Sequence, residues 1–117
     1  MKTLAVPFSV VFLAGCGLCN NTVKNTATSP DGKWVATAVV RDCGATTDYS
    51  PQVHLLKPGK SVWGIGNVFV GDHSSQIKVK WLSATNLMIY SDCKVSKHVT
   101  NYHGITIAHQ KKEPASN

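Results

Sequence analysis

An all-β fold is indicated by one stretch of this chain, Ser29-Pro30-Asp31-Gly32-Lys33-Trp34-Val35-Ala36-Thr37-Ala38-Val39-Val40-Arg41. Its first four residues predict a tight turn, because proline restricts φ, aspartate bonds locally and glycine accepts positive φ. Residues 33–41 predict a strand that is dense in valine and carries a tryptophan near its start. Apolar residues fall on both faces of this strand, which indicates a central strand covered on two sides.

Five further strands are predicted downstream. Alternation is cleanest over residues 76–82, where Ile77, Val79 and Trp81 point one way and two lysines point the other. Short apolar runs bounded by turn residues predict the remaining strands, over residues 52–57, 67–70, 87–91 and 104–109. No segment has helical periodicity. We therefore expect about six strands in a small, mostly antiparallel sheet, curled into a barrel or folded into a sandwich.

The N-terminus carries a short apolar segment, residues 4–14, which follows the basic residue Lys2 and leads into Gly15 and Cys16. A permanent membrane span needs ~20 apolar residues, so this segment is too short. Its order resembles the signal peptide and lipobox of bacterial lipoproteins. The resemblance implies cleavage before Cys16 and lipidation of that cysteine, which would anchor the chain to a membrane. The alternative is an ordinary secretory signal in which Cys16 is incidental.

The chain accordingly divides into four parts. We expect a lipoprotein signal peptide (1–15), the lipidated cysteine with a flexible polar tether (16–29), a β domain (30–109) and a polar tail (110–117). The mature length suits one small core. Gly17 follows the lipidated cysteine where an aspartate would favour inner-membrane retention. This favours the periplasmic face of the outer membrane if the cell is Gram-negative.

The chain is basic, with 12 Lys and Arg against 6 Asp and Glu, a formal charge of +6. Such an excess favours anionic surfaces, such as lipid headgroups or wall polymers. The lysines are scattered along the chain, which is equally consistent with a role in solubility. An extracytoplasmic address excludes nucleic acid as a partner.

Four cysteines have to be placed. Cys16 is assigned to the lipid, and export leads to an oxidising compartment where cysteines pair. Cys43 and Cys93 each follow an aspartate at the end of a predicted strand, and we expect them to form a disulfide if those strands are neighbours. Cys19 then remains an odd thiol in the tether.

Two family resemblances add to these expectations. Residues 29–36 resemble the turn and strand that open blades in β-propellers of the TolB type, and residues 81–89 resemble a degenerate second copy. The chain is too short for a propeller of four or more blades, so this likeness implies hairpin geometry only. More closely, four segments resemble a family of short bacterial proteins described as a domain of unknown function: Ser-Pro-Asp-Gly-Lys-Trp (29–34), Arg-Asp-Cys-Gly-Ala-Thr-Thr (41–47), Asn-Val-Phe-Val (67–70) and Lys-Trp-Leu (80–82). This second resemblance implies a fold and an envelope context, and no assigned active site.

Candidate binding residues lie mainly on a polar loop after the first predicted strand, since rigid scaffolds present binding groups on loops. The set comprises Arg41, Asp42, Thr46, Thr47, Asp48, Tyr49 and the separate Trp63. In the structural alternative Asp42 and the threonines cap a turn and Gly44 takes a positive φ. We expect Trp34 and Trp81 to fill the core, whereas Trp63 lies between glycine-rich turns as a candidate stacking residue.

Catalytic and metal sites are not indicated. The five histidines (His54, His73, His98, His103 and His109) lack His-x-His or His-x3-His spacing, so we expect no metal site and no cofactor. The few carboxylates sit mostly at turns, which disfavours a glycosidase pair. A Cys43 nucleophile would need a reduced thiol in an oxidising compartment. We therefore do not expect an enzyme.

The function expected from these features is that of a non-catalytic envelope lipoprotein. Its partners would be the membrane, through the lipid, and another envelope protein or a cell-wall component. The alternative is a periplasmic inhibitor or immunity-type protein against a lysozyme or toxin. Tight complex formation with a soluble enzyme favours the alternative, and co-purification with membrane or wall fragments favours the first.

Overall fold

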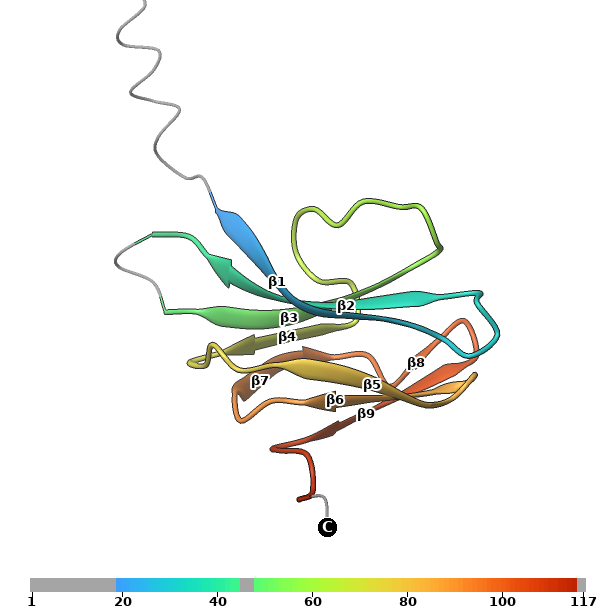
Figure 1. Cartoon of the computed structure of the whole chain (residues 1–117). Helices are drawn as coiled ribbons and strands as arrows, with labels where there is room; N and C mark the ends of the chain where they lie inside the picture. Colours follow the sequence, from blue (N-terminus) through green and yellow to red (C-terminus); the bar gives the residue numbers. More distant parts are fainter. Residues whose placement is uncertain (1–18, 45–47, 116–117) are drawn as a thin grey trace, which may run out of the picture.

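Two sheets pack face to face in the computed structural model, which describes residues 19–44 and 48–115 (Figure 1). The first sheet has the order β1-β2-β3-β4-β7, with the bounds Asn20–Thr28, Val35–Asp42, Ser50–Leu56, Phe69–Asp72 and Lys94–His98. The second has the order β5-β6-β9-β8, with the bounds Lys78–Ser83, Asn86–Tyr90, Ile105–Gln110 and Asn101–Tyr102. The strand pairs are antiparallel except for β6 and β9, which are parallel. The all-β prediction is confirmed, and the sheets form a sandwich rather than a closed barrel.

The predicted flexible tether is wrong for residues 20–28, which form β1. This strand pairs with β2 from Asn20 opposite Asp42 to Thr28 opposite Val35. It is an edge strand whose polar side chains are mostly exposed, so its sequence lacks the apolar alternation that marked the other strands. The β domain therefore begins at Asn20 and not at residue 30.

The predicted turn at residues 29–32 is confirmed, and it connects β1 to β2. The Ser29 hydroxyl donates to Asp31 Oδ1 at 2.7 Å, and Gly32 N–H donates to the Ser29 carbonyl at 2.8 Å. Gly32 has a φ of 72°, a conformation that glycine adopts at little cost. Trp34 N–H donates back to Ser29 Oγ at 3.1 Å, which fixes where β2 begins. The hydrogen bond from Ser29 lowers the pKa of Asp31, with a smaller contribution from Lys33 N–H.

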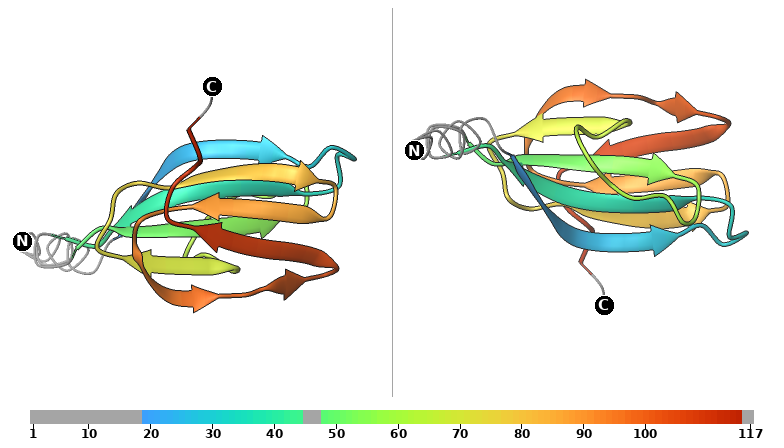
Figure 2. Two further views of the ribbon diagram at one scale, coloured as in Figure 1. Left: turned by 90° about the horizontal axis from the view of Figure 1, so that it is seen from below. Right: turned by 90° about the horizontal axis from the view of Figure 1, so that it is seen from above.

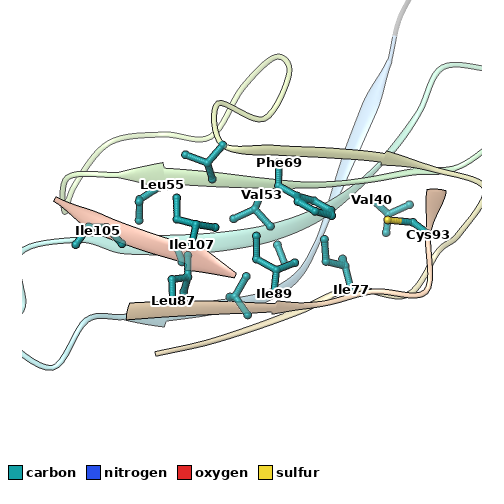
Figure 3. Close-up of a cluster of buried hydrophobic side chains, with 14 residues drawn as sticks. Val40, Val53, Leu55, Phe69, Ile77, Leu87, Ile89, Cys93, Ile105 and Ile107 are labelled. Atoms are coloured by element: carbon teal, nitrogen blue, oxygen red, sulfur yellow. The ribbon is translucent and has the colours of Figure 1, made fainter. Parts of the chain in front are cut away.

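The core lies between the two sheets (Figure 3). Phe69 of β4 is fully buried at its centre. Alternate residues of the first sheet face alternate residues of the second, and the buried cluster includes Ala36, Ala38, Val53, Leu55, Leu87, Ile89, Ile105 and Ile107. Trp34 and Trp81 pack against this cluster and stay partly exposed, so they flank the core instead of filling it. Within the described residues, no helix is long and apolar enough to cross a membrane.

Hydrogen bonds between β1 and β5 link the two sheets along one side of the sandwich. Asn25 Oδ1 accepts from Val79 N–H at 2.6 Å, and Trp81 Nε1 donates to the Ala27 carbonyl at 2.9 Å. These two bonds satisfy groups at the edges of both sheets, which otherwise would be open to pairing with another chain.

The structure corrects the predicted disulfide, because Cys43 pairs with Cys19 and not with Cys93. Cys19 and Cys43 adjoin the register pair Asn20 and Asp42, so they meet across the ends of β1 and β2. Cys93 lies directly before β7, at the opposite edge of the first sheet from β1, and is a buried free thiol. Its Sγ occupies the space that a side chain at Gly71 would need.

Candidate functional site

A long loop, residues 57–67, leaves the end of β3 and returns over the outer face of the first sheet (Figure 1). We call it the cover loop. That face carries Thr37, Val39, Gln52 and His54, which point away from the core and are nevertheless buried. The buried state of these side chains shows that the loop packs closely on the sheet.

Side chains of the sheet hold the cover loop in place. Arg41 Nη1 donates to the Gly64 carbonyl at 2.9 Å and to Asn21 Oδ1 at 3.2 Å. Gly66 N–H donates to Gln52 Oε1 at 2.7 Å. At the loop's end, Asn67 takes the place of a strand partner: its Oδ1 accepts from Leu55 N–H at 2.8 Å, and its Nδ2 donates to the Leu55 carbonyl at 2.9 Å. The loop therefore has a fixed path although it has no strand of its own.

The candidate site is a groove between the cover loop and one end of the sandwich, which we call the end groove. Its volume is about 780 Å³, within the range of small-molecule sites. It is lined by Trp34, Leu55, Leu56, Lys57, Lys60, Ser61, Trp63, Tyr102 and His103. Residues from both sheets and from the cover loop meet here. The lining contains two lysines and no carboxylate.

Aromatic rings form one wall of the end groove. The ring centroids of Trp34 and Tyr102 are 5.9 Å apart in an edge-to-face arrangement, and Trp34 lies 5.6 Å from the His103 ring. Lys57 Nζ sits 4.2 Å from the centroid of the Trp34 ring, a cation–π contact. This contact holds the ammonium group at the groove.

His103 occupies a conformation that is unusual for its residue type. Its φ is 50° and that of Gly104 is 84°, so two consecutive residues with positive φ make the turn between β8 and β9. A positive φ is uncommon for residues other than glycine, although histidine, like asparagine and aspartate, adopts it more often than most. The consequence is that an imidazole ring projects at the groove, 4.5 Å from the Tyr102 ring centroid.

Among the large apolar residues that the structure describes, Trp63 is the most exposed, with 81% of its surface accessible to solvent. It stands on the cover loop directly before Gly64, which has a φ of 71° and accepts the bond from Arg41. The indole is thus presented on fixed backbone, open to whatever enters the groove.

Among the predicted binding residues that the structure describes, Trp63 alone lines the end groove. Figure 2 shows the end of β2 and the start of β3 at the end where β1 begins, away from the β1–β2 and β8–β9 turns that border the groove. Arg41 reaches the site indirectly, through the Gly64 carbonyl.

The two aspartates of the predicted loop, Asp42 and Asp48, have structural contacts. Asp42 Oδ1 accepts from Gly44 N–H at 3.1 Å, and Gly44 has a φ of 128°, as in the structural alternative. Asp48 pairs with His73 Nδ1 at 2.6 Å, and the hydrogen bond from His73 lowers the pKa of Asp48. Tyr49 is half exposed. Thr46 and Thr47 lie outside the described residues, as does Cys16.

His98 and His109 make structural hydrogen bonds and do not line the end groove. His98 Nε2 donates to the Ile107 carbonyl, and His109 Nε2 donates to the Ser91 carbonyl, both at 2.8 Å. Among residues 19–44 and 48–115, no three His, Cys, Asp or Glu side chains come close enough together to hold a metal ion. The described lining of the end groove is aromatic and cationic, because it contains Trp34, Trp63, Tyr102 and two lysines.

His54 lies beneath the cover loop, 3% exposed, and its Nε2 has no hydrogen-bond partner among the described residues. Burial, and secondarily the nearby Arg41, lowers the pKa of His54 below its usual 6.5. The folded protein therefore binds fewer protons than the unfolded chain once the pH falls below about 6.5. The stability that His54 contributes as a neutral group is present above that pH and is lost as the pH falls through the folded pKa.

We expect the free energy of unfolding to fall between about pH 7 and pH 5, and to fall less steeply in a His54→Gln variant. Urea titrations at several pH values give both slopes. An NMR titration of the His54 ring gives the pKa itself, and a value above 6.5 in the folded protein would contradict this interpretation.

Comparisons with known proteins give no family for this chain: no family model, no curated protein and no solved structure matches it. The geometry of the end groove is therefore the basis for a functional proposal. The groove combines aromatic side chains, two ammonium groups and a loop that hydrogen bonds hold in place.

Proposed function

We propose that this chain is an envelope lipoprotein, anchored through Cys16, whose β sandwich is a non-catalytic binding module. The observation that carries the proposal is the end groove, where Trp34, Trp63 and Tyr102 meet two lysines. Ligand sites commonly combine aromatic side chains with a small number of polar groups, and this groove has both. Aromatic faces and ammonium groups can hold a ligand through stacking and charge.

The position of the groove fits a tethered module. β1 begins at one end of the sandwich, and the turns that border the groove lie at the other (Figure 2). Cys19 is tied to Cys43 at the first of these ends. Three residues from Cys16 to Cys19 span at most about 11 Å. A lipid on Cys16 would then hold that end close to the bilayer, with the Trp34 part of the groove at the far end, where Thr28 pairs with Val35.

The anchor is tested by fractionating bacteria that express the natural sequence or the Cys16→Ser variant. We expect the parent protein in the membrane fraction, with an intact mass raised by the lipid, and the variant in the soluble fraction without that mass. Two or more acyl chains make attachment effectively permanent, so the shift should be nearly complete. Cys93→Ser, which alters a thiol in the core, is the matched control and should fractionate like the parent. Identical processing and fractionation of Cys16→Ser and the parent would refute the anchor.

The binding role is tested by what accompanies the anchored protein. We expect membrane or wall fragments to co-purify with it, and a Trp63→Ala variant to carry less wall material. A tight complex with a soluble enzyme, in which the enzyme loses its activity, would instead identify an inhibitor and overturn the proposed role.

A further inference from the structure

We infer that the end groove binds a glycan whose sugars carry carboxylates, with a sugar ring on the Trp63 indole and a carboxylate at Lys57 and Lys60. This inference rests on the proposed function, because it names the ligand of the same groove. Three properties of the groove lead to it: one uncovered indole, two lysines that pair with no carboxylate of the described residues, and a volume larger than one sugar needs.

The sugar ring is assigned to Trp63 because the other indole of the groove is already covered. Lys57 Nζ lies over the Trp34 ring, and Tyr102 packs edge-on against it. Trp63 is 81% exposed, and the backbone after it is held by Arg41. Because hydrogen bonds already hold the backbone at Gly64, the loop loses little conformational entropy when a ligand covers the indole. The C–H face of a pyranose ring suits such a surface, while its hydroxyl groups remain in water at the rim.

The negative charge is assigned from the unbalanced lysines. Neither Lys57 nor Lys60 forms an ion pair with any carboxylate of the described residues, and the groove lining contains none. Lys78 and Lys80 are a contrast within the same chain. Both pair with Glu113, at 2.7 and 3.3 Å, and they lower the pKa of that carboxyl. An anion bound at Lys57 and Lys60 would supply the counter-charge that Glu113 supplies elsewhere.

A glycan fits these properties better than the other anions of an envelope. The groove, at about 780 Å³, has room for more than one sugar ring. Its lining combines aromatic side chains with ammonium and hydroxyl groups, which suits a chain of hydroxylated rings. A fatty acyl chain would instead need a lining without ammonium groups.

The test compares two tetrasaccharides by isothermal titration calorimetry on the full chain in detergent. One alternates N-acetylglucosamine with N-acetylmuramic acid and has free lactyl carboxylates. The other is chitotetraose, which lacks those carboxylates and is otherwise closely matched. We expect the carboxylated sugar to bind at least tenfold more tightly, with an advantage that shrinks as salt is added.

Two variants and two controls separate the contributions of the ring and the charge. Trp63→Ala should weaken binding of both sugars about tenfold, as truncation of an aromatic anchor does. Lys60→Gln should weaken the carboxylated sugar alone. Leu82→Ala, an exposed apolar residue of β5, and Lys24→Gln, an exposed lysine of β1, lie outside the groove and should bind like the parent.

The outcomes distinguish this inference from the proposed function. Equal affinity for both sugars, with both weakened by Trp63→Ala, overturns the carboxylate and leaves a glycan-binding module. Binding that Trp63→Ala does not change, or no binding of either sugar, overturns the glycan assignment altogether. The proposed function fails separately, if Cys16→Ser fractionates like the parent or if the captured partner is a soluble enzyme that the chain inhibits.

Discussion

Cys43→Ala is expected to lower the free energy of unfolding by about 3.5 kcal/mol. The bridge from Cys43 to Cys19 closes a loop with a sequence separation of 24, and the loop-closure entropy of that length gives this value. The loop contains the whole of β1 and β2, whose pairing starts beside the bridge. In a domain of this size the loss corresponds to a decrease in Tm of roughly 15 °C or more. Urea unfolding followed by tryptophan fluorescence measures it.

The matched control is Cys93→Ala. Its thiol is buried but unbridged, so the variant should lose only about 1 kcal/mol, the scale of one buried heavy atom. Adding reductant should bring the parent protein down to the stability of Cys43→Ala and leave that variant unchanged. Equal losses from Cys43→Ala and Cys93→Ala, with Cys19→Ala unaffected, would restore the pairing expected from sequence.

Phe69→Ala is expected to lower the free energy of unfolding by about 3–5 kcal/mol. Phe69 is fully buried between the sheets (Figure 3). The centroid of its ring lies 5.8 Å from that of His98 and 5.0 Å from that of His109. Truncation leaves a cavity at the centre of the core that neighbouring strands cannot close. The measurement is the urea midpoint at constant m-value.

Two comparisons show whether the cost comes from that cavity. Phe69→Leu keeps most of the volume and should lose less than half as much. Leu82→Ala removes an apolar side chain that is 57% exposed, and its effect should stay within about 0.5 kcal/mol. A loss below about 1 kcal/mol for Phe69→Ala would show that this residue does not organise the core.

The predicted strands correspond to β2, β3, β4, β5, β6 and β9, because each of these buries a face and so carries apolar residues at a regular spacing. β1, β7 and β8 were missed for the converse reason. Their side chains are mostly polar and exposed, and their pairing is specified by the backbone of a neighbouring strand. Hydrophobic periodicity reports burial, and an exposed strand at the side of a sheet gives little of it.

The disulfide prediction failed as a direct result of missing β1. With residues 20–28 assigned to a tether, nothing placed Cys19 near Cys43, although the two adjoin a register pair in the structure. The choice between Cys19 and Cys93 depends on which strands are neighbours. Short-range patterns do not carry that information.

Of the residues that line the candidate site, the sequence predicted only Trp63 as a binding residue. Trp63 was recognisable because an aromatic residue between glycines has no core to fill. Lys57, Tyr102 and His103 come together only through the packing of the two sheets and the path of the cover loop. The sequence Asn-Tyr-His-Gly at 101–104 did contain a local clue, since histidine there stands where a positive φ favours asparagine. That His103 belongs to the site is visible only in the structure, where its ring lies beside Trp34.

The three tryptophans allow one NMR experiment to locate binding, because their indole N–H groups give three separate resonances. Trp34 and Trp63 line the end groove, whereas Trp81 Nε1 is bonded to the Ala27 carbonyl where β5 meets β1. On titration with the carboxylated tetrasaccharide, we expect the Trp34 and Trp63 resonances to shift and that of Trp81 to stay. A shift of Trp81 alone, or no shift of any of the three, would show that the end groove is not the binding site.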